Sequence, residues 1–73
     1  MLRRIVDGDG EAWDVVRGSE SYGMMVALFC RCSDSRVRKT YLEASTPLGA
    51  DQEIDDSSDQ QLLDWLDEAQ PGP

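Results

Sequence analysis

A run of seven uninterrupted apolar residues, Met24 to Cys30, lies near the middle of this chain. It is far shorter than the roughly 20 residues that a membrane-spanning helix needs. As a strand it is apolar on both faces, because alternate side chains point to opposite sides: Val26, Leu28 and Cys30 on one, Met25, Ala27 and Phe29 on the other. A strand of this kind must be covered on both sides. We therefore expect a central strand over residues 24–32.

The segments around this strand have the pattern of two hairpins. Asp7-Gly8-Asp9-Gly10 provides the Asp-Gly turns that favour a tight hairpin, and Ser33-Asp34-Ser35 is a second turn signal. The expected order is a strand at Arg3–Val6, a strand at Glu11–Val16, a polar loop at Arg17–Gly23, the central strand, and a strand at Arg36–Glu43.

The last third of the chain predicts a connector, one helix and a tail. Pro47 and Gly49 argue against a long regular element in the acidic connector 45–57, although Thr46-Pro47 could begin one short helical turn. Ser58 with Gln61 three residues later forms a capping-box pattern. Apolar residues then recur at helical spacing, at Leu62, Leu66 and Ala69. We expect a helix over 58–69 and a tail over 70–73.

Together these elements predict a single α+β domain over 1–73. The two hairpins of 1–44 form a four-stranded, mainly antiparallel sheet with the helix packed on one face. A small SH3-like or open β-barrel with a C-terminal helix is the alternative. One helix covers one face only, so the other apolar face of Met24–Cys30 needs the connector, barrel curvature or a second copy, which raises a homodimer as a hypothesis. The element order is similar to that of many small bacterial domains, a likeness of shape that implies no activity.

Length and charge exclude several classes of function. A chain of 73 residues has little room for both a core and a deep pocket. It has no histidine, the commonest general base and metal ligand. We expect no enzyme activity, no cofactor and no metal site. Fifteen acidic and seven basic side chains give a net charge of −8, which repels phosphate backbones. With no apolar signal core at the N-terminus, we expect a cytoplasmic protein.

Acidic residues gather in the second half and suggest a partner-binding surface. Residues 43–73 contain nine acids and no base. In one interpretation Leu62, Leu66 and Ala69 pack on the sheet while the acids only meet water. In the other, the chain is a small regulatory or interaction module that binds a basic protein through residues 51–68. The candidate contact residues are Trp65, Asp64, Asp67, Glu68, Asp55 and Asp56.

Two further groups carry alternative hypotheses. Cys30 and Cys32 are too far apart in a strand for a disulfide, roughly 7 Å against a usual Cβ separation of about 3.8 Å. We expect both to be reduced thiols. They are weak candidates for a redox or metal sensor, and as a zinc site they would supply only two of the four ligands that structural zinc requires. A three-residue turn at 33–35 would place Cys30 opposite Arg38 and Cys32 opposite Arg36, lowering the thiol pKa.

The basic tip of the second hairpin is the other group. Arg31, Arg36, Arg38 and Lys39 are weak candidates for nucleic-acid contacts. Pairing with the acidic half, or protection of a sheet edge, explains the same charges. A last alternative is an acidic structural subunit of a homo-oligomer.

Overall fold

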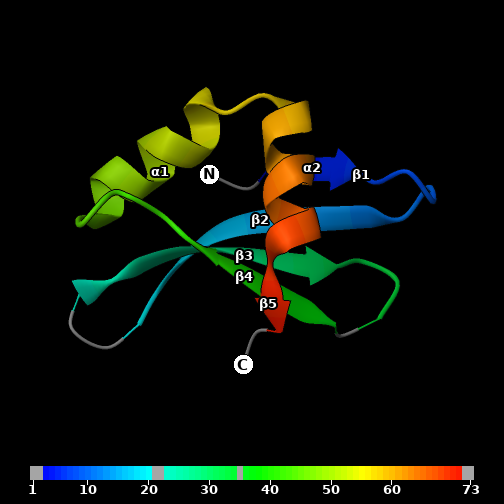
Figure 1. Cartoon of the computed structure of the whole chain (residues 1–73), viewed down its shortest axis with the longest axis horizontal. Coiled ribbons are helices and arrows are strands. Elements are labelled where there is room, and N and C mark those ends of the chain that lie inside the picture. The colour runs from blue at the N-terminus through cyan, green and yellow to red at the C-terminus, as the bar shows by residue number, and fades with distance from the viewer. Residues whose placement is uncertain (1–2, 21–22, 35, 72–73) are drawn as a thin grey trace.

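A computed structural model of the chain describes residues 3–20, 23–34 and 36–71. The fold is α+β, as the sequence predicts, but it contains five strands and two helices among these residues (Figure 1). The elements are β1 Arg3–Val6, β2 Ala12–Ser19, β3 Met25–Arg31, β4 Val37–Tyr41, α1 Pro47–Asp56, α2 Asp59–Glu68 and β5 Gln70–Pro71.

The five strands form one antiparallel sheet in chain order, β1-β2-β3-β4-β5. The sheet is open, since β1 and β5 are its two edges, and the barrel alternative is not formed. The first hairpin has the predicted turn: the Gly10 amide donates to the Asp7 carbonyl at 3.1 Å. Gly10 has a φ of 83°, a conformation that glycine adopts at no steric cost. β2 runs three residues further than predicted, because Arg17–Ser19 pair with β3.

The pairing of β3 with β4 corrects the predicted register. The Arg31 amide donates to the Arg36 carbonyl at 2.9 Å, and Cys30 lies opposite Val37. The connection is therefore one residue longer than the three-residue turn that would have set Cys30 against Arg38. Arg38 instead lies opposite Phe29.

The acidic connector contains a full helix, α1, where the sequence favoured at most one turn. Thr46 caps this helix, because its hydroxyl accepts the Gly49 amide at 3.1 Å. Pro47 occupies the first turn, where its missing N–H costs nothing. Ala50 and Ile54, one turn apart, are the buried residues of α1. Proline thus starts a helix here instead of preventing one.

The second helix confirms its predicted start. Ser58 is the N-cap of α2, and its hydroxyl accepts the Gln61 amide at 3.1 Å. Leu62 and Leu66 are buried, whereas Ala69 is the C-cap and ends the helix instead of extending its apolar stripe. The predicted tail then begins with β5, which pairs with β4. Pro71 is tolerated because β5 is an edge strand.

Both helices lie on the same face of the sheet (Figure 1). The core between the two layers consists of Ile5, Trp13, Val15, Ala27 and Phe29 from the sheet with Ile54, Leu62 and Leu66 from the helices. On the opposite face Val26 is only 1 % exposed. Leu28 leans over Gly18 there: a Cβ on Gly18 would lie 2.7 Å from Leu28 Cδ1. Val26 is therefore covered within a single chain.

Candidate functional site

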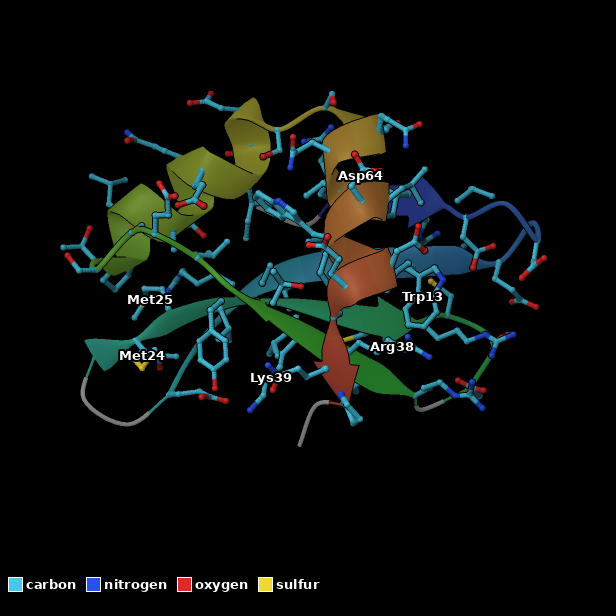
Figure 2. The ribbon with its side chains drawn as sticks, viewed as in Figure 1. Trp13, Met24, Met25, Arg38, Lys39 and Asp64 are labelled. Atoms are coloured by element: carbon cyan, nitrogen blue, oxygen red, sulfur yellow. The ribbon has the colours of Figure 1, made fainter. Side chains whose placement is uncertain are left out.

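The five predicted acidic contact residues all lie exposed on the two helices. Asp55 and Asp56 are the last two residues of α1, and Asp67 and Glu68 are the last two of α2. Asp64 lies on the outer side of α2 (Figure 2), where it accepts the Gln60 side-chain amide at 3.1 Å. We call these five residues the acidic helix surface.

The acidic helix surface is electrostatically unfavourable for the helices that carry it. The C-terminal end of a helix bears a partial negative charge, which disfavours nearby carboxylates. Neither α1 nor α2 has a basic residue in its last turn. Asp64 and Glu68 are also spaced i, i+4, the arrangement in which like charges on a helix repel. The fold alone therefore gives no reason for placing these carboxylates here.

Acids elsewhere on the protein are mostly paired. Glu11, Asp14, Glu20, Asp34, Asp51 and Asp59 each form an ion pair with an arginine or lysine. Across the residues that the structure describes, no member of the acidic helix surface has a basic partner. The acidic helix surface thus holds five of the nine acids that have no ion pair among the described residues, the others being Asp7, Asp9, Glu43 and Glu53.

Trp65, the predicted aromatic contact of this surface, lies partly inside the protein. Its side chain is half-buried and packs against the core. Its carbonyl accepts the Thr40 hydroxyl at 3.0 Å, which ties α2 to β4. A partner could therefore reach only the exposed part of the indole.

A second region, which sequence reasoning missed as a pocket, lies where the turn of the first hairpin meets the end of α2. Its volume is about 420 Å³. Trp13 forms part of its wall, held by a hydrogen bond from Nε1 to Asp7 Oδ2 at 2.9 Å. Asp7 Oδ1 also accepts the amides of Asp9 and Glu11, both at 2.9 Å. These hydrogen bonds, from Trp13 above all, lower the pKa of Asp7.

Arg31 lies at the centre of a charge network beside Trp13. Its guanidinium is 6.0 Å from the Trp13 ring centroid, 3.0 Å from Glu11 and 3.7 Å from Asp34. The hydrogen bond from Arg31, followed by one from Ser33, lowers the pKa of Glu11. The pKa of Arg31 is raised by the same bond to Glu11. Its charge is therefore neutralised within the protein.

Strand alternation separates the four basic candidates. Arg31, Arg36 and Arg38 line the pocket, whereas Lys39 belongs to the opposite face of β4 (Figure 2). Lys39 there forms an ion pair with Glu20, whose carboxylate also accepts the Tyr41 hydroxyl at 2.7 Å. That ion pair lowers the pKa of Glu20 and raises the pKa of Lys39. The four bases therefore do not form one continuous patch.

The two cysteines are free thiols in different surroundings. Cys30 is half-buried and Cys32 is exposed. Burial, followed by the charge of Asp14, raises the pKa of Cys30. The sequence expectation of a lowered pKa required Arg38 opposite Cys30, and the observed register removes that contact.

We expect thiol labelling to distinguish the two cysteines. A Cys30→Ser variant, which keeps Cys32, should react with a disulfide reagent about as fast as an exposed peptide thiol. A Cys32→Ser variant, which keeps Cys30, should react at least about tenfold more slowly at neutral pH, because less of its thiol is ionised and it is less accessible. The measurement is the rate of thiolate release in the folded protein, with the same variants in denaturant as control. Equal rates for the folded variants would contradict the assignment.

Across 3–20, 23–34 and 36–71, no three His, Cys, Asp or Glu side chains are grouped as metal ligands. None of the described helices is long and apolar enough to cross a membrane. No protein-family model, curated protein or solved structure matches this chain.

Proposed function

We propose that the protein is a small, non-enzymatic interaction module that binds a basic protein partner through the acidic helix surface. The observation that carries this proposal is the position of the carboxylates. Asp55, Asp56, Asp67 and Glu68 stand at helix ends that disfavour negative charge, and they have no basic partner in the described structure. A partner's lysines and arginines would supply the missing counter-charge.

The geometry also indicates how the contact would work. Exposed carboxylates on a helix layer speed the encounter with a positive surface and are weakened by salt. The half-buried Trp65 and the core behind it keep the helix fixed, so that little conformational entropy is lost on binding. As part of this proposal we place the protein in the cytoplasm, where Cys30 and Cys32 would stay reduced.

The test is charge reversal at two positions one helical turn apart, Asp64→Lys with Glu68→Lys. The matched control is Asp9→Lys with Glu43→Lys, two exposed acids that lie off the acidic helix surface. Each pair changes the net charge from −8 to −4, since each replacement adds two units. The wild type is immobilised, basic proteins retained from a lysate are eluted by a salt step, and the affinity of the partner is then measured for each purified variant.

We expect the helix pair to weaken binding by about 100-fold, and the control pair by less than about threefold. The helix pair should also raise the melting temperature, because lysine near the end of α2 suits the helix dipole. Loss of binding could then not be ascribed to unfolding. Equal losses in both pairs, or retention of no basic protein by the wild type, would refute the proposal.

A further inference from the structure

Three arginines line the pocket beside Trp13. The backbone amide of Arg31, the last residue of β3, donates to the carbonyl of Arg36, the residue just before β4, at 2.9 Å. Arg38 lies on β4, two residues after Arg36, so in extended backbone the two side chains point to the same face. All three line the pocket. Like charges placed side by side on one face of a sheet are destabilising.

Only one of these three charges is neutralised within the described residues. Arg31 has Glu11 and Asp34. Arg36 and Arg38 have no ion-pair partner there, although the chain has fifteen acids for seven bases. The remaining bases, Arg3, Arg4, Arg17 and Lys39, are all paired. The two basic residues without an ion pair in the described part of the chain thus line the same pocket.

We propose that Arg36 and Arg38 form a binding site for the oxyanion group of a small molecule. A guanidinium offers a planar fork of donors that matches a carboxylate or a phosphate. A volume of about 420 Å³ is of the size that small-molecule sites have. This inference does not depend on the acidic helix surface binding a protein.

The other walls of the pocket restrict the ligand further. Four carboxylates also line it. Asp7 accepts the Trp13 indole hydrogen and Glu11 is paired with Arg31. The carboxylates of Asp9 and Asp67 have no such partner among the described residues, so a polyanion would be repelled. Their oxygens can accept hydrogen bonds from hydroxyl or amino groups beside the bound oxyanion. The pocket therefore fits a small hydroxylated or aminated acid better than a nucleic-acid strand.

The walls are fixed before any ligand arrives. Trp13 is 5 % exposed and is held by Asp7, and Leu66 is 6 % exposed. Arg31, stacked beside Trp13, is held in place by Glu11. These wall residues lose little freedom on binding, so the cost of ordering side chains falls mainly on Arg36 and Arg38.

The test uses two probes that differ in the oxyanion, glycerate and glycerol 3-phosphate, with glycerol as the uncharged reference. Each is titrated into the ¹⁵N-labelled protein while the Nε–H signals of the arginines and the Nε1–H signal of Trp13 are followed. We expect saturable shifts at Arg36, Arg38 and Trp13 with at least one of the two anions, and none with glycerol. Saturation by only one probe would identify the site as carboxylate- or phosphate-selective.

The variant Arg36→Gln with Arg38→Gln should weaken binding by at least about tenfold. The control, Arg4→Gln with Arg17→Gln, removes the same charge from two exposed ion pairs elsewhere and should bind as the wild type does. An amide spectrum of each variant verifies the fold. Shifts that grow linearly without saturation for both anions, or equal weakening in the control, would overturn the proposal.

Discussion

Replacing Phe29 by alanine should remove about 3–5 kcal/mol of the free energy of unfolding. Phe29 is 0 % exposed and belongs to the core between the sheet and the two helices. A domain of this length has roughly 4–11 kcal/mol in total, at about 0.05–0.15 kcal/mol per residue. The loss is thus a large fraction of the total, and the variant should unfold at a clearly lower urea concentration than the wild type. Urea unfolding followed by tryptophan fluorescence and by circular dichroism measures the loss.

The neighbouring residue provides the control that makes this result informative. Leu28 is half-buried and points to the face without helices, so Leu28→Ala should cost only about 1–2 kcal/mol. Similar losses for Phe29→Ala and Leu28→Ala would contradict the layer arrangement. If a second copy covered the Leu28 face, the cost of Leu28→Ala would be large and would vary with protein concentration. The same experiment thus tests the homodimer hypothesis.

The strands were predictable because their signals are local. The Asp-Gly turn and the apolar run at Met24–Cys30 locate the first hairpin and the central strand within a few residues of β1, β2 and β3. The sequence does not predict α1, because Pro47 and Gly49 are residues that disfavour the interior of a helix. At the first turn proline is favourable, and burial of Ala50 and Ile54 against the sheet stabilises the rest. Tertiary contacts of that kind are not visible in the local pattern.

The two candidate regions differ in how far the sequence could define them. The acidic helix surface follows from composition, since residues 43–73 contain no base. The pocket cannot be read from the composition. It brings the turn between β1 and β2 together with Arg36 and Arg38, which follow β3 in the chain. A one-residue difference in the length of the second turn decides whether Arg38 lies opposite Cys30 or Phe29. The spacing of the residues does not decide between these two registers. It therefore does not decide on which face of the sheet Arg36 and Arg38 lie.

Trp13 is the second residue whose loss should have a large effect. It is 5 % exposed, belongs to the core, and donates its indole hydrogen to Asp7 at 2.9 Å. Trp13→Ala should therefore cost about 3–5 kcal/mol in the free energy of unfolding. Trp13→Phe keeps most of the apolar contact and deletes the donor, and should cost about 1–2 kcal/mol at neutral pH. Urea unfolding measures both variants against the wild type.

The pH dependence separates the hydrogen bond from the packing. The Trp13 donor, with the Asp9 and Glu11 amides, holds the pKa of Asp7 below its ordinary value of 3.8. A lowered pKa in the folded state adds stability above pH 3.8, and that stability is lost as the pH falls through the folded pKa.

In Trp13→Phe the pKa of Asp7 moves back toward 3.8, so less stability is lost on acidification. We therefore expect the stability gap between the wild type and Trp13→Phe to narrow as the pH falls below about 3.8. The pKa values of Glu11, Asp14 and Glu20 are also lowered. The stability lost when these three groups are protonated is the same in the wild type and in Trp13→Phe, so it cancels in the stability gap. Unfolding curves recorded from pH 7 downward measure this gap. A gap that stays constant with pH would show that Trp13 stabilises the fold through packing alone.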